Sequence, residues 1–559
     1  PPSAVLPDFR VPLPRPGQAR AWWRTPPNGT ALACAALAAA RQHPGPLLLV
    51  ARDNHAAHQL ETDLRALAGE DPELPVLGFP DWETLPYDRF SPHPDITSQR
   101  LATLARLPAL ARGLVVVPAA TLLQRLAPPE HVLGRRFDLR LGQRLDLGAE
   151  QRRLEAAGYR HVPQVYDPGD FAVRGGLLDV YPMGADAPFR VELLDAEIDS
   201  IRLFDPETQR SLDRCDAIDL LPGREVPLEP ERVQAALQAL RERFDVDTRR
   251  SGLVQDLKAG LAPAGIEYYL PLFHPRTATL FDYLPAAHLP LLEDGALEAA
   301  EQAWARIGER YELLRHDLER PLLPPAELWL PPEALRERLN QGHRIEVCGN
   351  AHPRHGEAHA LPLQPAPSLP LAARDHAPGE ALRGFLAQYP GRVLVAADSP
   401  GRREALLDVL QAAGLRPVVV GSWAAFAFPA PPGGRERAAQ QEGSVAGRTL
   451  TPTPLPEGEG PACAIAVAAL DDGFALDAPA LCVLTERQLF PERASQPRRR
   501  KRAGREPEAV IRDLGELTEG APIVHEDHGV GRYRGLVAMD VGGMPGEFLD
   551  IEYAKGDRL

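Results

Sequence analysis

Lysine is almost missing from this sequence. Only three of its 62 basic residues are lysines, namely Lys258, Lys501 and Lys555, and the others are arginines. An ATPase of the P-loop type needs a glycine-rich loop whose backbone amides bind phosphate and which ends in a lysine followed by serine or threonine. The three lysines are followed by alanine, arginine and glycine, respectively. The sequence therefore predicts no ATP-driven motor within its 559 residues.

Cysteine is also scarce, and long apolar runs are missing. The five cysteines are far apart and none forms a C-x-x-C pair, which argues against a zinc site or a disulfide framework and favours a reducing compartment. No stretch of about 18 uncharged apolar residues is present to span a bilayer, and the proline-rich N-terminal sequence has no signal-type apolar core. We expect a monomeric, cytoplasmic protein with no membrane segment, no metal and no cofactor of its own.

The charge balance limits the choice of partners. The formal net charge is −15, whereas phosphate contacts require clustered lysine and arginine, so a surface adapted as a whole to nucleic acid is not expected. An acidic balance favours protein partners or small ligands. The chain length predicts about three to five domains, and the 60 prolines predict many loops.

The first 135 residues have the pattern of an α/β domain. Helical patterns at 31–40, 54–68 and 97–111 alternate with apolar strands at 47–51 and 113–118, and a short helix, TLLQRL, follows. Continuous apolar strands are typical of a buried parallel sheet. The loop TPPNGT before the first helix stands where a phosphate-binding loop would stand, but it has one glycine and no lysine. We therefore expect a degenerate P-loop fold that binds no nucleotide at this loop.

Three regions of different character follow. Residues 136–221 combine several strand candidates, FAVRGGLLDVYP among them, with one helix near 150–157, and predict a compact α+β domain. Residues 222–362 are mainly helical. A further α/β unit of unclear role spans 366–488, and its stretch rich in proline, glycine and charge at 429–461 is predicted to be a disordered insertion.

The C-terminal part combines a basic linker with a β-type segment. Residues 489–510 are polar and include the cluster 498–502, which is either solvated or in contact with nucleic acid. Residues 511–559 alternate like strands between glycine-rich turns and predict a small all-β barrel of the SH3/Tudor type. Because the sequence stops just after a strand candidate, we expect this barrel to be truncated. His525 and His528 lack a third ligand and are interpreted as loop residues rather than a zinc site.

Several long strings of residues resemble, in the same order, those of one protein family. They are FPDWETLPYDRFSPHPDITSQRL (79–101), YRHVPQVYDPGDFAVRGGLLDVYPMG (159–184), FRVELLDAEIDSIRLFDPETQRS (189–211), AGIEYYLPLF (264–273), LFDYLP (280–285) and VHEDHGVGRYRGL (524–536). These strings resemble blocks of bacterial transcription-repair coupling factors and, more loosely, of the excision-repair protein UvrB. Several long strings in register are far more specific than one short motif, and the resemblance covers nearly the whole sequence except 429–461.

The resemblance implies a fold and a function. It implies a UvrB-like domain formed by 1–135 and 222–362, which has lost its nucleotide site, an inserted UvrA-binding domain at 136–221, and an RNA polymerase interaction domain at 511–559. Members of the family recognise RNA polymerase stalled at a lesion, displace it by ATP-dependent translocation on double-stranded DNA, and recruit UvrA for nucleotide excision repair. Their motor, an ATP hydrolase of helicase superfamily 2 that uses ATP and magnesium, would follow the present residues. Whether this chain is itself an enzyme stays open.

For UvrA, the resemblance points to three residues of the inserted domain. Arg174 and Arg190 match key arginines of the family's UvrA-binding surface, and Leu194 stands where family members can have an aromatic residue. Arginine suits such a surface because its rigid guanidinium group can pair with a carboxylate through two hydrogen bonds. The alternative for Arg190 is a local ion pair with Glu192 or Asp195.

For RNA polymerase, the resemblance points to the strand YRGLVAMDV and to the β subunit as the partner. Alternation along the strand places Val537 and Met539 on one face and Asp540 on the other. Met539 matches an apolar polymerase-contacting position of the family; the alternative is that it fills the core of the barrel. The strand edge is suited to docking by β-augmentation, in which backbone hydrogen bonds give affinity and alternate side chains give specificity.

A stand-alone UvrB-like protein that binds damaged DNA is the alternative function. UvrB has a long aromatic hairpin after its FPDWETLPY-like stretch, and this hairpin threads damaged DNA. The present sequence instead runs almost directly from Tyr87 into a helix. Direct recognition of a lesion by this chain is therefore not expected.

Overall fold

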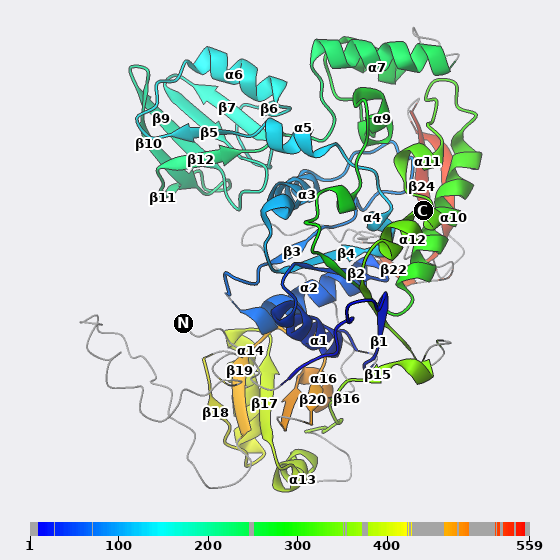
Figure 1. The fold of residues 1–559 in the computed structure, drawn as a ribbon. Coiled ribbons are helices and arrows are strands. Elements are labelled where there is room, and N and C mark those ends of the chain that lie inside the picture. Colours follow the sequence, from blue (N-terminus) through cyan, green and yellow to red (C-terminus); the bar gives the residue numbers. More distant parts are fainter. Residues whose placement is uncertain are drawn as a thin grey trace.

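The computed structural model describes most of the chain between residues 9 and 553. Outside this description are residues 1–8, 27, 70, 245–250, 350, 351, 353, 354, 372–377, 422, 424, 425, 427–462, 478, 479, 491–519, 521, 526–528, 542, 543 and 554–559, and only the backbone is described for the strand residues between 522 and 531 and between 538 and 549. The described part is a multidomain α/β protein with five β-sheets (Figure 1). No helix in it is long and apolar enough to cross a membrane.

The first sheet is wholly parallel, with the strand order β15-β1-β14-β13-β2-β4-β3. Its strands are β1 (Arg20–Arg24), β2 (Leu47–Ala51), β3 (Val76–Gly78), β4 (Leu114–Pro118), β13 (Leu289–Leu292), β14 (Arg344–Val347) and β15 (His359–Ala360). Strands β2 and β4 are fully buried, as their continuous apolar sequences predict. The predicted parallel sheet is confirmed. Strands that follow the inserted unit, β13 and β14, lie in the middle of this sheet between β1 and β2.

The helices of the first unit occur where the sequence pattern predicts them, but some of their ends differ, since the helix predicted at 97–111 spans Pro94–Arg106. They are α1 (Gly29–Gln42), α2 (Asn54–Ala68) and α3 (Pro94–Arg106), and α2 has the predicted bounds. The helix predicted over TLLQRL is shorter than expected, because α4 (Ala119–Leu122) stops where Gln124 forms a β-bridge with Trp329. Tertiary pairing thus ends a helix that the local sequence would continue.

Helix α1 has no exposed face over most of its length. Every residue from Thr30 to Ala40 is buried, and most of them are alanine. One apolar core contains this helix together with residues of the first sheet, such as Leu49, and residues of a second α/β unit, such as Leu394 and Phe474. Figure 1 shows α1 between these two sheets. Alanine has the small side chain that lets two sheets pack closely against one helix.

This α/β unit follows the first unit and the inserted unit in the sequence and is called the third unit. It is built on a mixed sheet with the order β16-β20-β21-β17-β19-β18. Its elements are β16 (Leu363–Pro365), α13 (Glu380–Gln388), β17 (Arg392–Ala397), α14 (Pro400–Ala412), β18 (Val418–Val419), β19 (Cys463–Val467), β20 (Phe474–Leu476), β21 (Leu481–Leu484) and α16 (Glu486–Leu489). The unit therefore begins before the predicted boundary at 366. The insertion predicted at 429–461 lies outside the described residues, and so does the linker predicted at 489–510, apart from the buried Leu489 and its neighbour.

The inserted unit carries a six-stranded sheet with the order β11-β10-β9-β8-β7-β6 and a separate pair, β12-β5. Its elements are β5 (Phe137–Arg140), α6 (Leu147–Ala156), β6 (Arg160–His161), β7 (Asp170–Arg174), β8 (Leu177–Val180), β9 (Phe189–Leu194), β10 (Glu197–Phe204), β11 (Ser211–Arg214) and β12 (Ala217–Leu220). The single strand candidate FAVRGGLLDVYP is wrong, because it forms two antiparallel strands, β7 and β8. Gly175 provides the turn with a φ of 60°.

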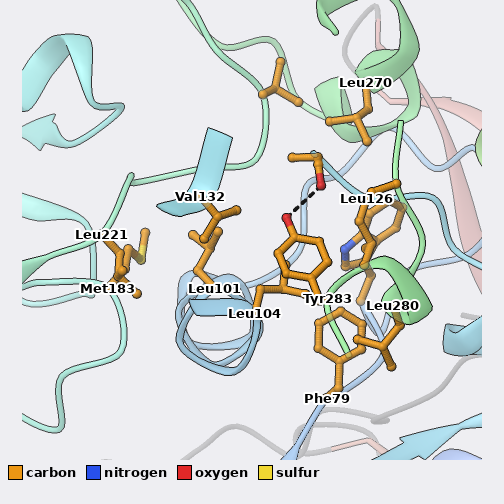
Figure 2. Packing of buried hydrophobic residues seen from close by; sticks show 14 of the residues in the cluster. Phe79, Leu101, Leu104, Leu126, Val132, Met183, Leu221, Leu270, Leu280 and Tyr283 are labelled. Carbon is orange, nitrogen blue, oxygen red and sulfur yellow. Dashed lines mark hydrogen bonds between the residues drawn. The ribbon is translucent and has the colours of Figure 1, made fainter. Parts of the chain in front are cut away.

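One large apolar core joins the first sheet, the inserted unit and the helices of the middle region. Those helices are α5 (Pro129–Gly134), α7 (Pro230–Arg243), α8 (Gly252–Lys258), α9 (Leu270–Phe273), α10 (Ala296–Leu314), α11 (Pro325–Leu328) and α12 (Pro332–Asn340). Figure 2 shows Leu101 of α3 beside Met183 and Leu221 of the inserted unit. In the same core the Tyr283 hydroxyl donates to the carbonyl of Ala127 at 2.7 Å. The inserted unit is therefore packed against the body rather than tethered by loops alone.

The C-terminal sheet is antiparallel and contains β22 (Pro522–His525), β23 (Gly529–Val541) and β24 (Met544–Glu552), with β23 in the middle. Tyr533 and Ile551 are paired across β23 and β24, and both are buried. A β-bulge lies between Tyr533 and Gly535. The predicted β-type character of this segment is confirmed.

Candidate protein-docking site

The six-stranded sheet of the inserted unit packs one face into the large core, and its other face carries charged residues, called the charged face here, beside a small apolar cluster that includes Ala172 and Phe204. On the apolar face, Phe171, Leu178, Val191 and Ile201 come from four neighbouring strands and are all buried in the large core. Since side chains alternate between the two faces of a strand, the residues next to them in sequence lie on the other face. The charged face is thus directed away from the body of the protein.

Strand register aligns three arginines with one aspartate on the charged face. Asp179 of β8 is paired with Arg190 of β9, Arg190 with Arg202 of β10, and Arg202 with Arg214 of β11. Directly paired residues lie on the same face of a sheet. Arg174 is five residues before Asp179 in the same hairpin and also reaches it. The face therefore has several arginines near the buried carboxylate of Asp179.

Asp179 is the acceptor that holds this face together. It is 1% exposed and accepts hydrogen bonds from Arg190 Nε at 2.7 Å, from Arg190 Nη2 at 2.9 Å, and from Arg174 Nη2 at 2.5 Å. A buried carboxylate needs such paired cations, because its desolvation would otherwise be very costly. The two arginines satisfy Asp179 from adjacent strands.

Arg190 is mainly an internal residue of the sheet. Its side chain is 17% exposed, its guanidinium carbon lies 4.7 Å from the centre of the Phe204 ring, and Nη1 donates to the carbonyl of Gln209 at 3.3 Å. The hydrogen bonds to Asp179 raise the pKa of Arg190 despite its partial burial. The alternative prediction, a local ion pair of Arg190 with Glu192 or Asp195, is wrong about the partner, which is Asp179.

Neither alternative partner forms an ion pair with Arg190 in the described structure. Glu192 accepts instead from the hydroxyl of Ser200 at 2.7 Å, and Asp195 has a φ of 59° in the turn between β9 and β10. The carboxylate that does pair, Asp179, is eleven residues away along the sequence. Its contact depends on strand register, which the sequence pattern alone does not supply.

Arg174 and Leu194 are the exposed members of the predicted set. The Arg174 side chain is 49% exposed, and Leu194 is 67% exposed at the end of β9. The end of β9 lies close to the turn that follows Arg174, because the Leu193 amide donates to the Gly176 carbonyl in that turn at 2.9 Å. An exposed arginine and an exposed leucine therefore share one edge of the charged face. Arg202 and Arg214 on the same face were not predicted.

This arrangement can bind an acidic protein surface with an apolar contact beside it. Among the described residues, Arg174 donates to Asp179 through Nη2 alone. The other nitrogens of its guanidinium group can therefore donate to a carboxylate of a partner. Leu194 offers an apolar side chain next to it, although aromatic residues are the stronger interface anchors. The buried pairing beneath fixes the position of both strands.

The C-terminal sheet offers a different kind of surface, a strand edge. Strand β22 pairs with β23 only from Gly529 to Arg532, and the Tyr533 carbonyl accepts from the Gly520 amide at 2.7 Å. The same edge of β23 beyond Tyr533 has no strand partner among the described residues. Leu536 and Val537 lie on this stretch and are 36% and 40% exposed. Met539 and Asp540 pair with Gly546 and Pro545 of β24, but their side chains lie outside the described residues.

Comparison with protein-family models gives three matches along the chain. Residues 137–225 match the UvrB interaction domain, residues 385–432 match the MFD, D3 domain, and residues 517–559 match the CarD-like/TRCF RID domain. The first match contains every strand of the charged face, and the third contains the C-terminal sheet.

Comparison with curated proteins gives relatives named transcription-repair-coupling factor. The chain is 37% identical over 534 residues to the transcription-repair-coupling factor of Escherichia coli (strain K12), a match that covers 95% of this chain and 43% of that protein. The factor of Haemophilus influenzae is 35% identical over 535 residues, with the same coverage, and that of Bacillus subtilis is 25% identical over 559 residues. The chain thus spans less than half the length of these relatives. Over 95% of its own length, it is homologous to the transcription-repair-coupling factors.

Proposed function

We propose that this chain recruits partners in transcription-coupled nucleotide excision repair. In this proposal the charged face of the inserted unit docks UvrA and the C-terminal sheet docks the β subunit of RNA polymerase. The observation that carries the proposal is the arginine face ordered by Asp179 within the region that matches a UvrB interaction domain. The names of the relatives favour it over a stand-alone UvrB-like protein that binds damaged DNA.

The three residues predicted for UvrA have different parts in this proposal. Arg174 contacts a carboxylate of UvrA directly, and Leu194 makes an apolar contact beside it, because these two side chains are exposed. Arg190 is a positioning residue, since its guanidinium is bound to Asp179 and covers Phe204. It keeps β8 and β9 aligned so that Arg174 and Leu194 present one surface.

For RNA polymerase, the proposal uses the unpaired edge of β23. The β subunit would add a strand to this edge, with Val537, Met539 and Asp540 providing specificity on alternate sides. We also propose that the C-terminal sheet belongs to a small barrel of the SH3/Tudor type. The match of residues 517–559 to a CarD-like/TRCF RID domain supports both parts.

Translocation on double-stranded DNA, together with its ATP and magnesium, is assigned in this proposal to a motor outside these 559 residues. The support is the sequence argument from lysine: the loop before α1 has no lysine, and none of Lys258, Lys501 and Lys555 is followed by serine or threonine. The chain then acts by binding rather than by catalysis.

The first prediction concerns Arg174. Arg174→Gln removes the charge but keeps a donor for Asp179, so it should weaken binding to purified UvrA by about tenfold or more with little change in melting temperature. Biolayer interferometry with immobilised UvrA measures the affinity. Arg140→Gln is the matched control, because Arg140 is 71% exposed on β5, outside the six-stranded sheet. Unchanged affinity in Arg174→Gln would remove this residue from the interface.

The second prediction concerns Arg190. Arg190→Ala leaves the buried Asp179 with Arg174 alone and uncovers Phe204, so the inserted unit should lose about 3 kcal/mol of unfolding free energy. Urea-dependent proteolysis of the inserted unit measures the loss, and UvrA binding should weaken in parallel. If binding falls while stability is unchanged, Arg190 is a direct contact instead of a positioning residue.

The third prediction concerns Val537. Val537→Glu places a charge at the proposed polymerase edge and should reduce binding to RNA polymerase by about tenfold or more, while UvrA binding stays as in the parent chain. Val409→Glu on α14 is the control, because Val409 has the same exposed fraction of 40%. Pull-down with the polymerase core enzyme compares the two, and equal retention of polymerase by both variants contradicts the assignment.

A further inference from the structure

A short loop of the third unit meets the beginning of helix α1. This segment, the closing loop (Asp471–Gly473), lies between β19 and β20. The Asp472 amide donates to the Thr30 hydroxyl at 3.0 Å, and the Asn28 side-chain amide donates to the Gly473 carbonyl at 3.1 Å. Asn28 also caps α1, since its side-chain oxygen accepts from the Ala31 amide. The loop is therefore bonded to the first turn of the helix.

A buried carboxylate from helix α2 completes these contacts. Asp63 is fully buried; its Oδ2 accepts from the Thr30 hydroxyl at 2.7 Å and its Oδ1 accepts from the Asp471 amide at 2.8 Å. Asp63 thus bonds α1 and the closing loop at once. Buried polar groups that are fully paired in this way specify one arrangement of their neighbours.

Further contacts hold the closing loop from its other side. Gln488 of α16 donates to Asp472 Oδ1 at 2.6 Å, and Arg487 pairs with Asp471 at 2.8 Å. Gly473 has no room for a side chain, because an added Cβ would lie 2.6 Å from both the Gln488 side chain and the Val483 carbonyl and 2.7 Å from Ala366. The loop is packed tightly against its own unit as well as against α1.

These contacts lie at the N-terminal end of α1, where a P-loop protein would bind phosphate. The free amides at a helix N-terminus, after a strand and loop, are the groups that bind phosphate in P-loop proteins. Here the first turn of α1 faces a protein loop, and the buried carboxyl group of Asp63 lies beside it. The same place that would hold a phosphate is filled by the third unit.

We infer that the third unit acts as an internal closure of the first unit: its closing loop occupies the N-terminal end of α1 and, through Thr30 and Asp63, fixes the two units as one body. This role does not depend on the proposed binding of UvrA or RNA polymerase. In this inference, the third unit (363–490) covers the N-terminal end of α1 in addition to sharing an apolar core with the first unit.

Burial gives the closure a dependence on pH. Burial raises the pKa of Asp63 to about 7 from its ordinary 3.8, against the lowering effect of the bonds from Thr30 and Asp471. The charged and titratable groups around the site are Asp471 and Asp472 of the loop, His55 of α2 and Arg487 of α16. A carboxyl with a raised pKa in the folded state stabilises it most below the unfolded value and loses this effect as pH rises through the folded value.

The first test removes one hydroxyl at the closure. In the intact 559-residue chain, Thr30→Val keeps the shape of the side chain but leaves the Asp472 amide and Asp63 each without one partner. Hydrogen exchange in peptides covering 468–476 and 28–36 should then accelerate together by about fivefold or more. Thr62→Val on α2 is the control, because the Thr62 hydroxyl is exposed and donates to the carbonyl of His58 in its own helix. Exchange in 468–476 that matches the parent chain would overturn the closure.

The second test uses the titration of Asp63. Asp63→Asn keeps an acceptor for the Asp471 amide and removes the ionisable group. The melting temperature of this variant relative to the parent chain should rise by about 3 °C or more between pH 4 and pH 8, since only the parent loses stability as Asp63 ionises. A difference that stays constant with pH shows that Asp63 does not titrate at the closure, and overturns its role there.

Discussion

The packing of helix α1 between two sheets is the constraint on which the rest of the structure depends. An α-helix with average side chains is about 10 Å across, and a sheet on each side would leave gaps or clashes unless the helix surface were small and uniform. The buried and mostly alanine segment from Ala31 to Ala40 meets this requirement. It places the first sheet and the mixed sheet on opposite sides of one helix, so neither sheet can move away without exposing apolar surface.

Buried polar groups have different roles at the closing loop and on the sheet of the inserted unit. At the closing loop, Asp63 and Thr30 bond segments from two units and set how these units meet. On the inserted sheet, Asp179 is bonded to Arg174 and Arg190 and orders a surface that faces outward. In both places a buried carboxylate fixes an arrangement rather than adding much net stability, because its desolvation offsets most of its pairing energy.

Local patterns were sufficient for the elements but not for the contacts between them. The bounds of α2 and β2 follow from apolar periodicity, because the residues that decide them are neighbours in sequence. The early end of α4 depends on pairing with Trp329, and the partner of Arg190 depends on strand register. The contact between Asp63 and Asp471 joins positions 408 residues apart. No periodicity carries such information, and the part of Met539 in binding stays a prediction.

The strand order of the first sheet has a consequence for how the chain folds during synthesis. Strands β13 and β14 lie between β1 and β2, although they are made after the whole inserted unit. At a synthesis rate of about 5–20 residues per second, β2 and β4 wait on the order of ten seconds for β13. The inserted sheet is contiguous in sequence and can form during that interval. The whole inserted unit is therefore synthesised while the first sheet still lacks β13 and β14, and the edge of β2 has no partner strand until residue 292 has been made.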